Sequence, residues 1–125
     1  MLKYFVYGSL RKGEYNHQLI QKKAKFVSYG VLREHTMVSF MFYPAIYWSG
    51  KGDIVGEIYE IEDKHTINQI HKMEIDSGYY LKTVMVGGED KPHLCFVYAM
   101  DKAKCIMKQR VCGGDWSKHN EETFI

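Results

Sequence analysis

Runs of β-branched and aromatic residues recur along this chain, and each is short and bounded by glycine, proline or polar residues. This pattern is typical of β-strands, which favour such side chains and end at turn residues. The two runs that flank the turn sequence GGEDKP are expected to form a hairpin. The predicted strands are Lys3–Tyr7, Phe26–Phe40 with a bend or bulge at Gly30, Ile54–Ile61, Tyr79–Val86 and Leu94–Met100.

Two segments between these strands have the apolar spacing of helices. They are Glu14–Ala24 and a segment that Asp63 can cap and that runs through Glu74. We expect Tyr43–Asp53 to be a loop with a short extended piece, and the glycine-containing segment after Met100 to be partly extended. Strands at both ends with two short helices between them favour an α+β fold, and closing the strands into a barrel would remove exposed edges.

The composition is that of an ordinary globular protein. A chain of 125 residues suits one domain, residues 1–125, and 46% apolar with 26% charged residues excludes a disordered chain. The net charge of +2 is far from the basic balance that favours nucleic acid, so we expect no nucleic-acid partner. No apolar stretch approaches the roughly 18 residues of a membrane span, and the start MLKYFVYG does not resemble a signal peptide. We therefore expect a cytoplasmic protein with no membrane partner.

A glycine loop follows the first predicted strand. Gly8 and Gly13 have the spacing of a phosphate-binding loop, but Glu14-Tyr15 occupies the place of the Lys-Ser/Thr pair that binds phosphate and magnesium. A nucleoside triphosphatase is therefore disfavoured. Two interpretations remain open: a purely structural turn, or a turn whose backbone N–H groups bind a carboxylate or a phosphate.

Glu74 stands on or next to the apolar face of the second predicted helix, at its end. One interpretation is a glutamate at a frayed helix end that faces water. The other is a partly buried carboxyl, whose pKa burial would raise towards neutrality and so suit it to general acid/base catalysis.

Metal and serine-hydrolase chemistry have little support in the sequence. The six histidines are scattered without an H-E-x-x-H motif, and no serine lies in a G-x-S-x-G motif. We expect no metal site and no cofactor.

An opening motif and six further short motifs occur in an order and at spacings that together are specific. The opening motif is formed by Tyr4 to Leu10, Gly13 and Asn16-His17, and the others are Tyr43-Pro44-Ala45, Val55 to Tyr59, Met73-Glu74, Ser77 to Tyr80, Val97-Tyr98 and Gly114-Asp115-Trp116. With these motifs the chain resembles the gamma-glutamylcyclotransferase-like superfamily, especially its short bacterial and archaeal members and the gamma-glutamylamine cyclotransferases.

The resemblance implies a small mixed β-barrel flanked by short helices and the release of 5-oxoproline from a gamma-glutamyl compound without a cofactor. It also implies that the loop of Tyr7, Gly8, Ser9 and Leu10 holds the glutamyl group. The catalytic glutamate of the family falls on Glu74. A tyrosine that lines the site in one branch of the family falls on Tyr80.

Two departures affect the residues around the catalytic position. Met73 replaces the more usual aromatic or basic residue, and Ile75-Asp76 replaces a frequent glycine, which bears on substrate preference. Alternatives to a cyclotransferase are a non-catalytic module that binds small carboxylates and an amidase that releases free glutamate. The leaving amine and the oligomeric state stay open.

Overall fold

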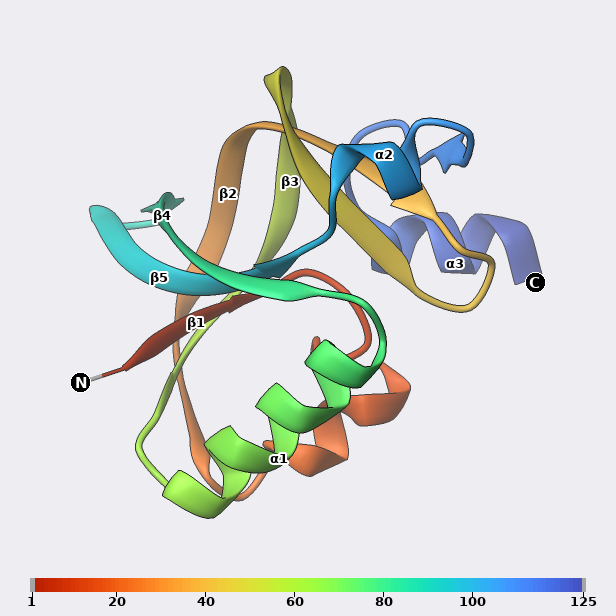
Figure 1. Cartoon of the computed structure of the whole chain (residues 1–125). Helices are drawn as coiled ribbons and strands as arrows, with labels where there is room; N and C mark the ends of the chain where they lie inside the picture. The colour runs from red at the N-terminus through yellow and green to blue at the C-terminus, as the bar shows by residue number, and fades with distance from the viewer. Residues whose placement is uncertain (1, 125) are drawn as a thin grey trace.

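A long antiparallel pair of strands, β2 (Ala24–Ser39) and β3 (Pro44–Ile61), forms the frame of the fold. We describe residues 2–124 of the chain from a computed structural model (Figure 1). The two strands pair from Ala24 opposite Ile61 to Ser39 opposite Pro44. Both strands bend strongly, so that the two ends of each strand lie in different parts of one curved sheet.

The sheet closes into a barrel. Within residues 2–124 five strands follow one another in the order β3-β1-β5-β4-β2, and β2 pairs with β3 again. The barrel is mixed because β1 and β5 are parallel and the other pairs are antiparallel. The α+β prediction and the mixed barrel with flanking helices are confirmed. The remaining strands are β1 (Lys3–Val6), β4 (Tyr80–Gly88), β5 (Pro92–Ala99) and β6 (Gln109–Arg110), which pairs with β2 outside the barrel.

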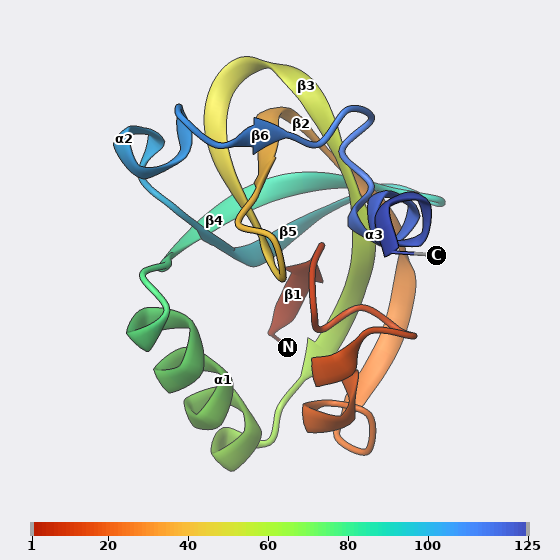
Figure 2. The ribbon, with the colours of Figure 1, turned by 90° about the vertical axis from the view of Figure 1, so that its right-hand side faces the viewer.

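Helices flank the barrel on separate sides. Figure 2 shows α1 (Lys64–Asp76) and α3 (Trp116–Phe124) at opposite sides of it, while α2 (Lys102–Cys105) is a single short turn. Asp63 caps α1 by accepting the N–H of Thr66 at 3.0 Å. None of the helices within residues 2–124 combines the length and the apolar character needed to cross a lipid bilayer.

The first predicted helix is wrong over most of its length. Only Tyr15–Leu19 is helical, and as a 3-10 helix, labelled η1 here. The next turns close on the carbonyls of His17 and Ile20 alone, each of which accepts two N–H groups, so a regular helical ladder does not develop. Tertiary contacts override the helical spacing here, because Ile20 is fully buried.

The prediction of a loop with a short extended piece over Tyr43–Asp53 is also wrong, since all of it except Tyr43 belongs to β3. Gly50 and Gly52 adopt positive φ angles of 79° and 99° there, which lets the strand turn without ending. After Met100 the prediction of extended chain holds only for the two residues of β6, because α2 and α3 form in the rest.

The irregularities of β2 flank Gly30 instead of lying at it. Register shifts occur between Phe26 and Ser28 and between Arg33 and His35. A Cβ at Gly30 would lie 2.7 Å from Val86 and 3.2 Å from Ile58, so glycine is needed there for close packing.

Apolar side chains fill the barrel and the space under α1. The first cluster includes Phe5, Ile58 and Val97, and the second joins Ile70 of α1 to Ile61 of β3. The second cluster forms one wall of the cavity described below, so the packing of α1 positions the site.

We predict that Gly56→Ala destabilises the fold severely. A Cβ at Gly56 would lie 2.4 Å from the carbonyl oxygen of Val6 and 2.8 Å from the Phe5 ring, which would force β1 away from β3. We expect a loss of about 3 kcal/mol in the free energy of unfolding, measured with urea. Gly87→Ala is the control, because its Cβ would meet only Val31 at 3.7 Å, and we expect a change of about 0.5 kcal/mol or less. Equal losses in the two variants would contradict this account.

Candidate active site

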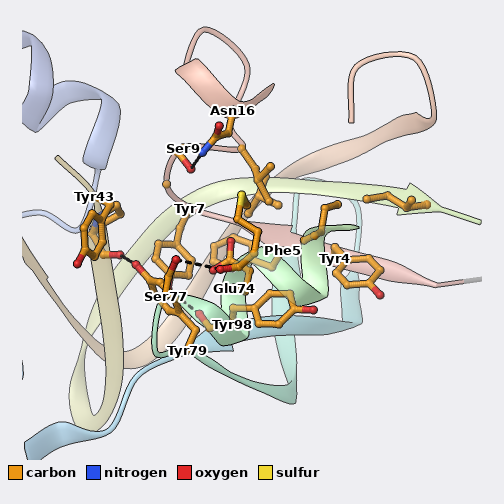
Figure 3. Close-up of a pocket in the computed structure, with 17 residues that line it drawn as sticks. Tyr4, Phe5, Tyr7, Ser9, Asn16, Tyr43, Glu74, Ser77, Tyr79 and Tyr98 are labelled. Carbon is orange, nitrogen blue, oxygen red and sulfur yellow. Dashed lines mark hydrogen bonds between the residues drawn. The ribbon is translucent and has the colours of Figure 1, made fainter. Parts of the chain in front are cut away.

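A cavity of about 160 Å³ opens between the loop after β1, the β2–β3 turn and the C-terminal half of α1. Figure 3 shows Glu74 near its centre, with Tyr7 and Tyr98 beside it. Of the described residues that line the cavity, Glu74 is the only charged one. The lining residues are Tyr4, Phe5, Val6, Tyr7, Gly8, Ser9, Leu10, Asn16, Tyr43, Pro44, Ile61, Ile70, Met73, Glu74, Ser77, Tyr79 and Tyr98.

The loop after β1 brings free backbone donors to the cavity. The N–H groups of Gly8, Ser9 and Leu10 donate no hydrogen bond to any residue within 2–124. A Cβ at Gly8 would lie 2.8 Å from the Pro44 ring, so only glycine allows this close approach. Asn16 donates its side-chain amide to Ser9 Oγ at 3.0 Å and steadies the other end of the loop. Such free N–H groups are suited to bind an anion or a carbonyl oxygen.

A buried charge network holds this loop against β3. Arg11 Nε donates to Glu57 Oε2 at 2.8 Å, and Arg11 Nη1 donates to Asp115 Oδ1 at 2.9 Å. Glu57 Oε1 accepts the N–H of Lys12 and the hydroxyl of Tyr59, both at 2.9 Å. Arg11 and Glu57 are only 8% and 3% exposed, so this network is shielded from water. The loop conformation is therefore fixed by Arg11 and Glu57, which do not themselves line the cavity.

Glu74 lies in the last turns of α1 and is half-buried. Its carboxyl makes no hydrogen bond or ion pair with the side chains and backbone of the described residues. Burial raises the pKa of Glu74 from 4.5 to about 7. A carboxyl with this pKa and no partner can both accept and donate a proton near neutral pH.

Three tyrosines surround Glu74, and each hydroxyl is already committed. Tyr7 donates to the Tyr98 carbonyl at 2.6 Å, Tyr79 donates to the Pro44 carbonyl, and the Tyr98 hydroxyl bonds His71 Nδ1 at 2.8 Å. Burial raises the pKa of all three, and the negative charge of Glu74 adds to the rise. The three tyrosines are therefore uncharged, and their fixed side chains form part of the cavity wall.

The structure brings five of the six predicted site residues together around this cavity: Tyr7, Gly8, Ser9, Leu10 and Glu74. It places Tyr80 outside, contrary to our expectation that this residue lines the site. Tyr80 begins β4 and is 39% exposed, whereas Tyr79, one position earlier, is 8% exposed and lines the cavity. Neighbouring residues at a strand start point to opposite sides, which explains the difference of one position.

Several residues that line the cavity have no role predicted from the sequence. Tyr43, Tyr79 and Tyr98 all fall within the motifs that carry the resemblance, as does Asn16, so the motifs held a usable signal. Glu57 and Asp115 of the Arg11 network also fall within these motifs, but Arg11 itself does not, and its two partners are 46 and 104 positions away in the chain. Among the described residues, no three His, Cys, Asp or Glu side chains are grouped so that they could hold a metal ion.

The barrel and its cavity define a small mixed-barrel protein with one carboxyl group at the centre of a ligand-sized cavity. Over residues 4–118 the sequence matches the family described as "Gamma-glutamyl cyclotransferase, AIG2-like". The chain belongs to this family.

Related proteins come from bacteria and archaea. YkqA of Bacillus subtilis, named "Putative gamma-glutamylcyclotransferase", is 30% identical over 118 residues, which are 92% of this chain and 41% of YkqA. MJ1514 of Methanocaldococcus jannaschii, which bears the same description, is 39% identical over 77 residues, or 61% of this chain and 63% of the relative. The chain thus spans less than two thirds of either relative.

Solved structures share the fold. The crystal structure of PH0828 from Pyrococcus horikoshii superposes with a TM-score of 0.76 at 30% identity, covering 98% of this chain and 95% of that one. The crystal structure of YkqA gives a TM-score of 0.81 at 25% identity and covers 98% of this chain and 42% of YkqA.

We predict that Arg11→Met destabilises the protein far more than loss of a surface ion pair. The substitution leaves the Glu57 carboxylate buried without its cation, which costs about 3 kcal/mol in the free energy of unfolding. Lys72→Met is the matched control, since Lys72 and Asp76 are exposed and their pair contributes about 0.5 kcal/mol or less. Urea denaturation of both variants checks this, and a similar loss in each would refute a structural role for the buried pair.

We predict that Glu74→Gln stabilises the fold at high pH. Because the pKa of Glu74 is raised in the folded state, the folded protein holds its proton more tightly than the unfolded chain does. Wild-type stability therefore falls relative to the variant as pH rises from about 4.5 to about 7, and the difference is constant above that range. Denaturation curves at several pH values test this. A difference that does not change with pH would show that Glu74 is not buried in solution.

Proposed function

We propose that this chain is a cyclotransferase that releases 5-oxoproline from a small gamma-glutamyl amine or peptide, with Glu74 as general acid and base. The observation that carries the proposal is the position of an unpartnered, half-buried carboxyl in the same cavity as the free N–H groups of Gly8, Ser9 and Leu10. Membership of the family supports the same reaction.

The reaction needs no second reactant. The α-amine of the substrate attacks the γ-carbonyl carbon of the same molecule, so a carbon–nitrogen bond closes the five-membered lactam. The bond from that carbon to the leaving nitrogen breaks, and the leaving amine takes up the proton that the α-amine loses. Because the reacting groups share one molecule, a well-oriented conformer gains an effective molarity of about 10^5 to 10^8 M. The task of the protein is then to select the folded conformer and to move the proton.

Glu74 fits the proton transfer. In its ionised form it can take a proton from the attacking α-amine, and in its protonated form it can give that proton to the departing nitrogen. A pKa of about 7 leaves both forms populated near neutral pH. The absence of a partner among residues 2–124 leaves its oxygens free to contact the substrate.

The loop supplies the electrostatic part. Glu74 is the only charged side chain among the described residues lining the cavity, so an anionic substrate group would depend on neutral donors. The N–H groups of Gly8, Ser9 and Leu10 would bind the substrate α-carboxylate or stabilise the carbonyl oxygen as negative charge builds on it. Both roles place the glutamyl group beside this loop.

We predict that Glu74→Gln lowers kcat by about 10^2- to 10^4-fold, because the amide keeps the size of the side chain but cannot accept a proton. The assay incubates the purified protein with gamma-glutamyl amides and quantifies 5-oxoproline by mass spectrometry. Glu62→Gln, on the exposed surface, is the control and should retain full activity.

The products distinguish the alternatives. Free glutamate in place of 5-oxoproline would indicate hydrolysis by water. Tight binding of a gamma-glutamyl amide to the wild type without any product would indicate a binding module. A Glu74→Gln variant as active as the wild type would rule out the role given to Glu74.

A further inference from the structure

A lysine and a histidine on neighbouring strands are in contact outside the cavity. The Nζ atom of Lys82 on β4 donates a hydrogen bond to Nε2 of His35 on β2, over 2.9 Å. Neither residue lines the cavity that contains Glu74. The proposed function does not use this pair, so its chemistry is a separate question.

The hydrogen bonds of His35 determine which of its ring nitrogens can accept a proton. His35 is 4% exposed, and its Nδ1 lies 2.8 Å from the carbonyl oxygen of Arg33. Because a carbonyl oxygen only accepts hydrogen bonds, Nδ1 carries the ring hydrogen, and Nε2 offers a lone pair to Lys82. Burial lowers the pKa of His35 in spite of the hydrogen bond to Arg33, and the charge of Lys82 lowers it further. The ring is therefore neutral and can act as a base at Nε2.

The side chain of Lys82 has no counter-ion. Directly opposite it on β5 is Val97, which is fully buried, so Lys82 starts on the face of the sheet that packs into the core. Lys82 forms no ion pair with a carboxylate within residues 2–124. Burial lowers the pKa of Lys82, so more of it is the uncharged, nucleophilic amine near neutral pH than of an exposed lysine. Lys82 is also partly exposed, so a small molecule can approach it.

A second contact between a lysine and a histidine shows what is different at Lys82. Lys3 Nζ lies 3.0 Å from His93 Nδ1, and the other ring nitrogen, His93 Nε2, lies 3.0 Å from Asp90 Oδ1. There a carboxylate compensates the positive charge of the pair. In the corresponding place His35 has a backbone carbonyl, which carries no net charge.

We propose that Lys82 is a site of covalent acylation, at which its amine reacts with small activated carboxylic acids such as acyl phosphates and acyl thioesters. A desolvated lysine amine beside a base has the environment of an activated nucleophile. The product amide is uncharged and keeps one N–H, which can still donate to His35 Nε2. Acylation therefore removes a partly buried charge without leaving the imidazole unpaired.

His35 accepts a proton in this reaction. The Lys82 nitrogen attacks the carbonyl carbon of the acyl donor, and a carbon–nitrogen bond forms. The bond from that carbon to the phosphate oxygen or to the thiol sulfur breaks, and phosphate or thiolate leaves with the electron pair. The proton that the nitrogen loses passes to His35 Nε2 and from there to water or to the leaving group. The step needs no oxidant or reductant.

The test measures the rate of acylation at each lysine of the wild type. The native protein is treated with acetyl phosphate or, in a second arm, with the uncharged thioester S-acetyl-N-acetylcysteamine, and is then denatured. Deuterated acetic anhydride labels the remaining amines, so mass spectrometry of peptides gives the reacted fraction at each position. We expect Lys82 to react about tenfold faster or more than the exposed Lys64, and Lys3 to react no faster than Lys64. The arm with the higher ratio identifies the leaving group that the site favours.

Two outcomes of this experiment would overturn the proposal. One is a rate at Lys82 no higher than that at Lys64 with both donors. The other is an equally fast reaction at Lys3, because the missing carboxylate would then make no difference. Neither outcome depends on whether the chain releases 5-oxoproline.

Unfolding the same chain separates the folded environment of Lys82 from its local sequence. In guanidinium chloride Lys82 and Lys64 should react at equal rates, and a ratio that persists there would refute the role of the contact with His35. His35→Gln keeps a hydrogen-bond acceptor but removes the base, and circular dichroism checks that it folds. We expect the ratio of the Lys82 rate to the Lys64 rate to fall about tenfold in this variant. An unchanged ratio in the folded variant would show that His35 does not take the proton.

Discussion

The ion pair between Arg11 and Glu57 is the interaction on which the site depends. It joins the loop after β1 to the C-terminal part of β3, and Asp115 extends it to the start of α3. A buried ion pair is not by itself a large source of stability, since apolar residues of the same size often do as well. Its contribution here is geometric. The Glu57 carboxylate accepts from Arg11, from the Lys12 N–H and from Tyr59 only when the loop has one conformation, so the N–H groups of residues 8–10 are left free in a fixed arrangement.

The barrel topology turns this loop into one wall of a cavity. β1 lies between β3 and β5 in the sheet, so the chain that leaves β1 lies beside β5. There the Tyr7 hydroxyl donates a hydrogen bond to the Tyr98 carbonyl of β5. α1 follows β3 directly and packs Ile70 into the cluster that contains Ile61. The loop and α1 are more than 50 residues apart in sequence, yet each is anchored to β3 or to its neighbours. The distance between the loop and Glu74 is therefore set by the sheet.

The class of fold was predictable because it rests on local patterns. Local patterns also singled out the loop after the first strand and Glu74, which the structure brings to one cavity. Alternating apolar runs marked the strands, and Glu74 stood out as a carboxyl at an apolar helical position. The prediction failed where contacts with residues distant in the sequence determine the local structure. Gly50 and Gly52 looked like loop residues, but the strand continues through them because Trp48 and Asp53, on either side, pair with His35 and Arg33 of β2. The helical spacing of Glu14–Ala24 gave way to the burial of Ile20 and to turns around His17. Tyr80 was expected in the site from the resemblance alone, and the sequence does not reveal that Tyr79 faces the cavity in its place. Arg11 was not selected because its partners are remote in the chain.

The isolation of Glu74 is the feature that connects stability with chemistry. Buried side-chain nitrogen and oxygen atoms within the described residues all have hydrogen-bond partners, so the chain pairs its polar groups wherever they are fully enclosed. Glu74 differs because its carboxyl reaches the cavity and has no partner there. A cation beside it would hold the carboxylate ionised and weaken it as a base, whereas an apolar surrounding keeps its proton affinity near neutrality. The same apolar surrounding makes the ionised form of Glu74 destabilise the folded state. The closely packed barrel can tolerate this loss of stability. A carboxyl tuned in this way is suited to moving a proton between two nitrogens of one ligand.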